Sequence, residues 1–291
     1  MNDIIRKFIM QRKSYLAPES VRYYEENLLR FEKWLCINCI DVLDLKSDDL
    51  RQYIVYLGLT GIKNVSLQTY YRAVKTFCRW LFEEEYIKND ITSKIKLPKD
   101  DSDIVIPLTD AEVKVIDNYF IYNCQQPLRN YCIFHLFLDC GLRRQEVLNL
   151  KTDDVNSNSL IIRNSKNNKS RIVLLPDFLY QSLINYLGNR SGFVFLDKYN
   201  NVPITENTIK KMFVNIRKLP YMGRLHAHLL RHTFATSYLY YGGNMEMLRL
   251  LMGHSSYSIL QNYVHLAAQE ELINSGLYKL DDIFFKNRRK N

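Results

Sequence analysis

The spacing of apolar residues in the first hundred positions predicts helices joined by short turns. In two segments the apolar residues recur at intervals of three and four, which places them on one face of a helix. The first set is Val21, Tyr24, Leu28, Phe31 and Leu35, and the second is Leu67, Tyr71, Val74, Phe77 and Leu81. Between them, Ser47 is positioned to cap a third helix, and Ser66 to open the helix of the second set.

The second half of the chain combines helices with short strands. The apolar run Tyr131–Leu138 predicts a helix that ends before Gly141. Two β-branched runs, Leu160–Ile162 and Ile172–Leu175, flank a polar segment and predict a hairpin, and Gly192–Leu196 is expected to add a third strand. The expected fold class is therefore mainly α, with a small antiparallel β-sheet in the C-terminal domain.

A polar stretch near residue 100 separates the two halves. Leu97–Asp103 contains a proline and almost no apolar residues, which is typical of a linker. Just beyond it, Thr109 and Glu112 form a capping box that opens a new helix. The expected boundaries are a helical domain over 1–98, a linker over 99–107 and a second domain over 108–291.

Charge narrows the class of partner. The 291 residues include 40 Lys and Arg against 31 Asp and Glu, which gives a net charge of +9. A chain this basic favours polyanions, chiefly nucleic acid, over acidic small molecules. With 47% apolar residues, wholesale disorder is excluded.

The sequence gives little support for membrane insertion, secretion or metal binding. No apolar run approaches the roughly 20 residues of a membrane span, and the N-terminus lacks a secretion signal, so we expect a cytoplasmic protein without a membrane partner. Cys36 and Cys39 form a CxxC pair, but no second pair at zinc spacing accompanies it. The six cysteines are expected to be thiols in a reducing compartment, and no metal is expected.

Four clusters in the second half carry groups that bind a phosphodiester or transfer protons at one. Arginine binds phosphate with a planar, bidentate fork, and histidine titrates near neutral pH. In chain order the clusters are Arg143 after a helix-ending glycine, the hairpin cations Lys166, Lys169 and Arg171, His228 with Arg231 at a helix start, and His254 with Tyr263 nine residues later. Each cluster alone is a weak signal, but the four together, in this order, are specific.

The four clusters resemble the pattern of the tyrosine recombinases, a family of integrases, Xer-type resolvases and tyrosine transposases. The family has an Arg in a TGLRxxE-like box, a hairpin Lys, an HxLRH box, an LGH-like box and a Tyr nucleophile. The matching positions here are Arg143, Lys166, His228, Arg231, His254 and Tyr263. Tyr71–Leu81 and Ile95–Lys99 also look like the family's core-binding domain and linker. The resemblance implies a two-domain DNA clamp, with a SAM-like core-binding domain over 1–98 and the catalytic domain over 108–291.

The chain departs from the family pattern beside the catalytic positions. Cys140 stands where a threonine is usual, and Gln145 where a serine or glycine is common. Met252 replaces a leucine, a volume-conserving exchange. The hairpin lacks the usual Gly-Lys-Gly, so Lys169 stays an alternative to Lys166. None of the six catalytic residue types is missing, which favours an active enzyme.

The resemblance implies transesterification by a tyrosine. Tyr263 would attack a DNA phosphodiester and form a 3′-phosphotyrosyl link with release of a 5′-hydroxyl. A phenol with a pKa of about 10 needs a positioned base, and His228 is the candidate. Lys166 would protonate the departing 5′-oxygen.

The remaining roles implied by the resemblance are electrostatic. Arg143 and Arg231 would hold the non-bridging oxygens, and His254 would donate a further hydrogen bond to the phosphate. Glu146 would support the arginines. With these cations in place, no Mg²⁺ is required, and no ATP either, because the phosphotyrosyl link keeps the ester energy; no cofactor is expected.

The resemblance also implies the partners. Four protomers would assemble on two double-stranded DNA sites, with Ile283–Phe285 of the tail docking in trans or packing within the same chain, and an accessory protein is possible. Candidate DNA contacts are the cations of one helical stripe and of the hairpin, namely Arg72, Lys75, Arg79, Lys169 and Arg171.

Other functions stay open at this stage. A type IB topoisomerase uses the same catalytic residues but needs no specific site. A catalytically silent DNA-binding protein would bind without forming an adduct, and a small-molecule enzyme would do neither. Integration, excision, transposition and chromosome-dimer resolution are not separated by the sequence.

Overall fold

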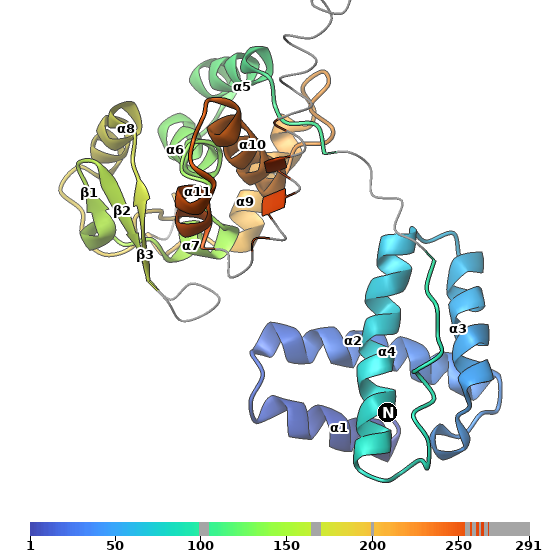
Figure 1. Ribbon diagram of the computed structural model, residues 1–291. Helices are drawn as coiled ribbons and strands as arrows, with labels where there is room; N and C mark the ends of the chain where they lie inside the picture. The colour runs from blue at the N-terminus through green and yellow to red at the C-terminus, as the bar shows by residue number, and fades with distance from the viewer. Residues whose placement is uncertain are drawn as a thin grey trace, which may run out of the picture. The chain divides into compact units, whose positions relative to one another are not determined.

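The chain forms two compact units, Met1–Ile104 and Val105–Asn291, each with its own apolar core (Figure 1). The computed structural model describes residues 1–98, 105–163, 170–198 and 201–253, together with Tyr257, Leu260, Gln261, Tyr263, Val264 and Ala267. Among the helices of these residues, none is long and apolar enough to cross a bilayer.

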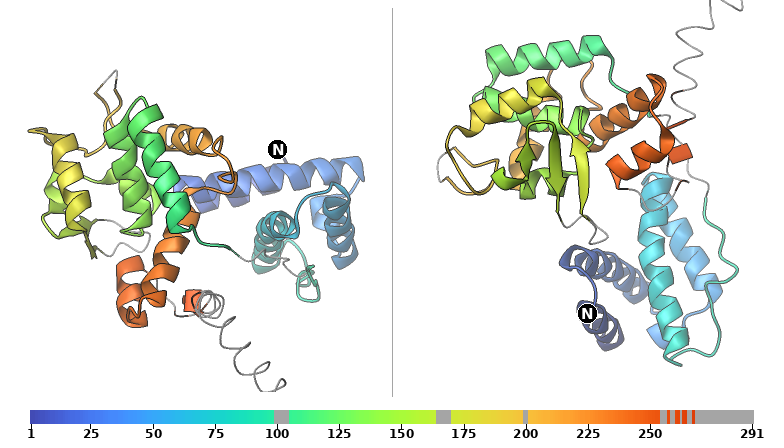
Figure 2. Two further views of the ribbon diagram at one scale, coloured as in Figure 1. Left: turned by 90° about the horizontal axis from the view of Figure 1, so that it is seen from above. Right: turned by 60° about the vertical axis from the view of Figure 1, so that its left-hand side comes forward.

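Unit 1 is built from four α-helices arranged as two pairs. They are α1 (Asp3–Lys13), α2 (Pro18–Ile37), α3 (Ser47–Leu59) and α4 (Asn64–Glu83). The pair α1–α2 crosses the pair α3–α4, as Figures 1 and 2 show. The apolar face predicted for α4 is fully buried, and that of α2 is buried except for Tyr24, which packs half-buried against the same core. Both helical predictions are confirmed.

The starts of two helices differ from the expectation. Ser47 is the first residue of α3 and not its cap, because its hydroxyl donates to the Ile91 carbonyl at 2.8 Å. Asp49 satisfies the helix end instead, by accepting from the Lys46 amide at 2.8 Å. The helix α4 begins two residues before Ser66.

In unit 2, helices surround one central helix. Its helices are α5 (Asp110–Asn123), α6 (Pro127–Leu138), α7 (Arg144–Asn149), α8 (Asp177–Leu187), α9 (Glu206–Ile216), α10 (Ala227–Tyr240) and α11 (Met245–Met252). Figure 1 shows α6 enclosed by α5, α8 and α10. Because α6 is apolar nearly all round, it forms the middle of the core.

The sheet of unit 2 confirms the predicted hairpin but not the third strand. Strands β1 (Val155–Asn156), β2 (Ser159–Ile162) and β3 (Arg171–Leu174) are antiparallel in that order. The expected strand Gly192–Leu196 is wrong, because Phe193 and Leu196 make only isolated bridges to two different partners. Gly192, with a φ of +102°, bends the backbone at the start of this segment.

The capping box predicted for α5 is present and connects to a distant helix. The Glu112 carboxylate accepts from the Thr109 amide at 2.9 Å, and the Thr109 hydroxyl accepts from the Glu112 amide at 3.3 Å. The preceding amide, of Leu108, donates to the Thr233 hydroxyl on α10 at 3.0 Å. The start of unit 2 is therefore tied to the helix that carries His228 and Arg231.

A buried histidine joins α5 to α6. The Nε2 atom of His135 lies 2.9 Å from Asp117, and its Nδ1 atom lies 2.6 Å from Asp139. Burial by itself lowers the pKa of His135, but the hydrogen bonds and charges of the two carboxylates outweigh it and raise the pKa to about 9. The imidazolium form therefore dominates at neutral pH.

This charge predicts a pH-dependent stability. Since the folded-state pKa is raised, the stabilisation is complete below the ordinary value of 6.5 and is lost as pH rises through about 9. We expect unit 2 to lose up to about 3 kcal/mol of unfolding free energy over this interval, and His135→Gln to lack that loss. The measurement is urea unfolding by circular dichroism. Both tryptophans, Trp34 and Trp80, lie in unit 1, so their fluorescence marks the other transition. Equal pH slopes in both proteins would contradict the assignment.

Candidate active site

A glycine turn places Arg143. Gly141 has a φ of +61°, and a Cβ atom there would lie 2.5 Å from the ring of Phe234, so only glycine fits this position. The turn brings Arg143 to the N-terminal cap of α7. From there Glu146, three residues on, lies within reach of both the backbone and the side chain of Arg143.

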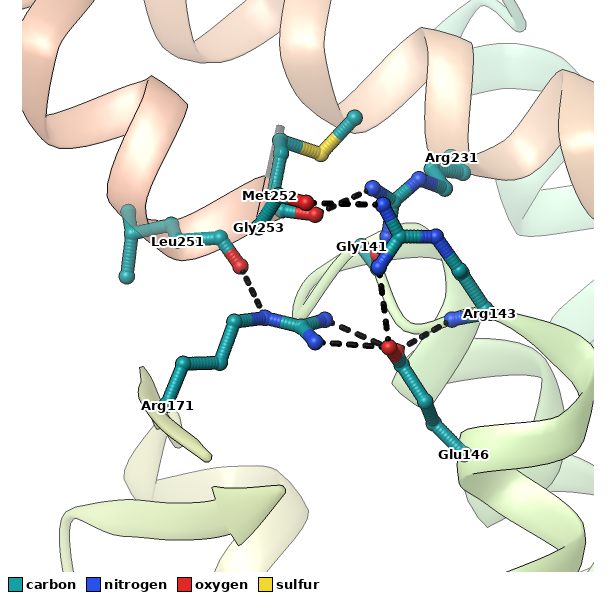
Figure 3. Close-up of polar contacts among 8 residues, drawn as sticks. All are labelled: Gly141, Arg143, Glu146, Arg171, Arg231, Leu251, Met252 and Gly253. Atoms are coloured by element: carbon teal, nitrogen blue, oxygen red, sulfur yellow. Dashed lines mark hydrogen bonds and ion pairs between the residues drawn. The ribbon is translucent and has the colours of Figure 1, made fainter. Parts of the chain in front are cut away.

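Glu146 is a buried carboxylate between two arginines (Figure 3). It accepts from the Arg143 amide at 2.7 Å and from Arg143 Nη1 at 3.0 Å. Arg171 at the start of β3 grips the same carboxylate with both terminal nitrogens, at 2.6 and 2.7 Å. Burial by itself raises the pKa of Glu146, but the hydrogen bonds and charge of Arg171, aided by Arg143, lower it to about 2. The carboxylate therefore stays ionised.

The C-terminal end of α11 supplies the other acceptors. The last carbonyls of a helix have no partner within it, and they carry the negative end of the helix dipole. Here Arg171 Nε donates to the Leu251 carbonyl at 2.7 Å, and Arg143 Nη2 donates to the Gly253 carbonyl at 3.1 Å. Arg231 donates to the Met252 carbonyl at 2.6 Å. Three arginines thus meet at one helix end, as Figure 3 shows.

Gly253 lets the arginines approach. Its φ of +62° is left-handed and ends α11, and a Cβ atom there would lie 3.1 Å from Arg171 Cδ and 3.4 Å from Arg143 Nη1. A larger residue would crowd both guanidinium groups.

Two members of the predicted histidine box differ in exposure. Arg231 is 4% exposed and also donates to the Gly141 carbonyl. Burial, and then the charge of Arg143, lower the pKa of Arg231 to about 9, so it remains a cation at neutral pH. His228 in the first turn of α10 is exposed; partial desolvation, and then His226 and Arg231, lower the pKa of His228.

Tyr263 lies in helical backbone and is 4% exposed. It packs in a small core with Leu248, Met252 and Leu260. Burial raises the pKa of Tyr263, whereas the charges of Arg231 and Arg143 act against this. The phenol is therefore neutral but within the field of both arginines.

One ring contact was missed from the sequence. The ring centroid of His232 lies 5.0 Å from that of Tyr263, and His232 Nδ1 is buried with no hydrogen-bond partner in the described part of the chain. His232 follows Arg231 directly in the HxLRH box, and this position was the only sequence signal for it.

Some of the predicted site residues lie close together in the structure, and others lie outside the described residues. The charges of Arg143 and Arg231 act on both His228 and Tyr263. The predicted residues beyond the described ranges are Lys166, Lys169, His254 and the tail segment 283–285.

The predicted DNA contacts divide in two. Arg171 is turned into the protein, with its side chain 9% exposed, and its guanidinium is engaged by Glu146 and a main-chain carbonyl. This burial favours an internal supporting role in place of the expected DNA contact. On α4 of unit 1, Arg72 and Arg79 are exposed and Lys75 is half-buried.

No metal site accompanies the arginine cluster within the part of the chain that the structure describes. Across those residues, no group of three or more His, Cys, Asp and Glu side chains is arranged to hold an ion.

Comparison with known families matches both units. Residues 107–270 match the phage integrase family, and residues 7–85 match the phage integrase N-terminal SAM-like domain. Among curated proteins, the tyrosine recombinase XerC of Bacillus pumilus is 26% identical over 278 residues, covering 90% of each chain. The tyrosine recombinase XerD of Rickettsia prowazekii is 26% identical, covering 86% of this chain and 88% of its own.

Solved structures share the fold. The Tn1549 transposon integrase in complex with circular intermediate DNA superposes with a TM-score of 0.75 at 21% identity, covering 90% of this chain and 94% of its own. The XerH site-specific recombinase bound to a palindromic difH substrate gives a TM-score of 0.73 at 18% identity, covering 94% of this chain and 84% of its own.

Removing the charge of Glu146 should be costly. Glu146→Gln leaves two largely buried guanidinium groups without their counter-ion, so we expect a loss of about 3–5 kcal/mol of unfolding free energy, measured by urea denaturation. The matched control is Glu206→Gln, which weakens surface contacts with Arg144 at 3.1 Å, Lys210 at 3.9 Å and Gln145 at 2.7 Å and should cost about 1 kcal/mol or less. Equal losses in the two variants would contradict the central place of Glu146.

Proposed function

The chain belongs to the phage integrase family and is a tyrosine site-specific recombinase, and we propose that it breaks and rejoins double-stranded DNA through a 3′-phosphotyrosyl intermediate. The observation that carries this proposal is the convergence of Arg143 and Arg231 on one helix end, with Tyr263 in their field. That arrangement is suited to a phosphate next to a phenol.

The first step is attack by Tyr263 on a backbone phosphorus. The phenol oxygen forms the new bond to phosphorus while the bond to the 5′-oxygen breaks, and the leaving electron pair stays on that oxygen. Because burial keeps the phenol protonated at rest, the attack needs a base. His228 takes the phenol proton, and Lys166 gives a proton to the departing oxygen.

The two arginines neutralise the charge that gathers in the transition state. Arg143 spends two of its five N–H donors on Glu146 and Gly253, and its side chain keeps 25% exposure, so it can still reach a non-bridging oxygen. Arg231 is fixed by the carbonyls of Gly141 and Met252 and lies deeper. Since both are held before DNA arrives, little reorganisation is needed during reaction.

The other predicted groups complete the proposal. His254 donates a hydrogen bond to the phosphate, and Glu146 with Arg171 keeps Arg143 in place. Rejoining reverses the first step, with a 5′-hydroxyl of the partner strand attacking the phosphotyrosyl link. No ATP is needed because the ester energy is retained.

The proposed function also assigns roles to unit 1 and to the assembly of several protomers. The helical domain over 1–98 binds the same duplex as the catalytic domain, with the exposed Arg72 and Arg79 and the half-buried Lys75 on phosphates. Four protomers act on two sites, with an accessory protein as a possible further partner. The likeness to recombinases solved on DNA supports the binding of double-stranded DNA.

The nucleophile is tested by covalent trapping. A nicked DNA duplex that carries the recombination site is incubated with wild type and with Tyr263→Phe. The products are run on a denaturing gel. We expect an adduct with wild type and none with Tyr263→Phe, because the phenol oxygen is the attacking atom.

Tyr257→Phe is the matched control. Tyr257 lies six residues before Tyr263 and is 50% exposed, so its replacement should leave the adduct intact. If Tyr263→Phe still forms the adduct and Tyr257→Phe does not, the nucleophile is Tyr257 and the assignment of Tyr263 is wrong. Relaxation of any supercoiled plasmid, without a specific site, would favour a type IB topoisomerase instead.

The state of His228 predicts the pH profile of cleavage. Partial desolvation and the neighbouring His226 and Arg231 lower the pKa of His228 below its ordinary 6.5, so its neutral, proton-accepting form persists below that pH. On the acid side, we expect the single-turnover cleavage rate to fall with a midpoint below pH 6.5. A low-pH limb with its midpoint above that value would argue against His228 as the base.

A further inference from the structure

A polar cleft of about 770 Å³ lies in unit 2, lined by residues of α5, α6, α9 and their connections. None of its lining residues belongs to the arginine cluster around Glu146. Its volume lies within the usual range for sites that bind small molecules. Four of the lining side chains are cations, namely Arg129, Lys198, Lys211 and Lys218, and the one lining carboxylate among the described residues is Asp197.

Arg129 is the most unusual of these residues. It is 9% exposed, and its Nε atom donates to the Asn130 side chain at 3.1 Å, which orients the guanidinium. Within the described part of the chain it forms no ion pair, and its two terminal nitrogens have no hydrogen-bond partner. The fully buried side-chain nitrogens that lack a partner do not include those of Arg129, so its terminal nitrogens are open to the cleft. An anionic ligand in the cleft would pair with them.

The surrounding groups favour the same sign of ligand. The helix α6 begins at this cleft with Pro127, and its cap residue Gln126 makes no side-chain capping bond, so the first amides of the helix are left without a capping side chain. A helix start of this kind attracts anions. Thr208 and Asn207 add hydroxyl and amide groups to the wall.

We propose that this cleft is a phosphate-binding site, with Arg129 as its anchor and Lys211 and Lys218 as its outer cations. The planar fork of a guanidinium binds phosphate oxygens bidentately, and lysines add charge without fixed geometry. The phosphate is either a DNA backbone phosphate or that of a free phosphorylated molecule. The second source does not depend on the proposed recombinase function.

The test titrates the full chain with inorganic pyrophosphate by calorimetry at constant ionic strength. We expect one site in wild type, and affinity weaker by about tenfold or more in the double variant Lys211→Gln, Lys218→Gln. The matched control is Lys210→Gln, the neighbouring residue on α9, which lines a different pocket with Arg144 and Arg217 and should keep wild-type affinity. Arg129→Gln should abolish binding, and if it fails to fold, the exposed lysine pair decides.

Competition identifies the source of the phosphate. If pyrophosphate weakens DNA binding by wild type but not by the double variant, the two compete for the cleft, and the cleft binds a DNA phosphate. Pyrophosphate that binds without competing indicates a free phosphorylated ligand. If pyrophosphate gives no heat, the DNA affinities decide. A lower DNA affinity of the double variant than of Lys210→Gln would show that the site binds DNA phosphates only.

Two results would overturn the proposal. One is pyrophosphate binding that the double variant and Lys210→Gln weaken equally. The other is no pyrophosphate binding together with equal DNA affinities of those two proteins.

Discussion

A single buried carboxylate allows three arginines to meet inside this protein. Without Glu146, the positive charges of Arg143, Arg171 and Arg231 would repel one another in an environment that solvates them poorly. Because its pKa is held near 2, Glu146 remains an anion wherever the protein is folded at ordinary pH. The carbonyls at the end of α11 supply the remaining acceptors, so the cluster has a net positive charge without unpaired buried donors on the arginines (Figure 3).

This arrangement constrains distant parts of unit 2. Gly141 and Gly253 both adopt left-handed backbone at points where a side chain would strike a neighbour, so the chain reverses tightly beside the guanidinium groups. Arg171 connects the sheet to the cluster from β3. The hairpin, two helix ends and α10 are therefore coupled through one set of hydrogen bonds, and displacement of any of them would move Arg143.

The buried arginines of unit 2 are compensated in two different ways. Arg171 and Arg231 have their donors engaged by a carboxylate or by main-chain carbonyls, whereas Arg129 has one orienting bond to Asn130 and faces a polar cleft. The first kind holds a site in shape. The second retains binding capacity, which is the basis for assigning a phosphate to that cleft.

Periodicity determined the helical faces, the hairpin and the capping box at Thr109, because these depend on local spacing. Motif order predicted Arg143, Arg231 and Tyr263 as one group, and the fold brings both arginines to the end of α11 with Tyr263 in their field. Tertiary structure alone decided that Arg171 turns inward and that Gly192–Leu196 forms no strand. The acceptors at the end of α11 are main-chain carbonyls, which every residue carries, so no side-chain pattern in the sequence predicts them. An arginine has the same letter in the sequence whether it faces solvent, Glu146 or a polar cleft. Only packing determines which charge lies opposite it.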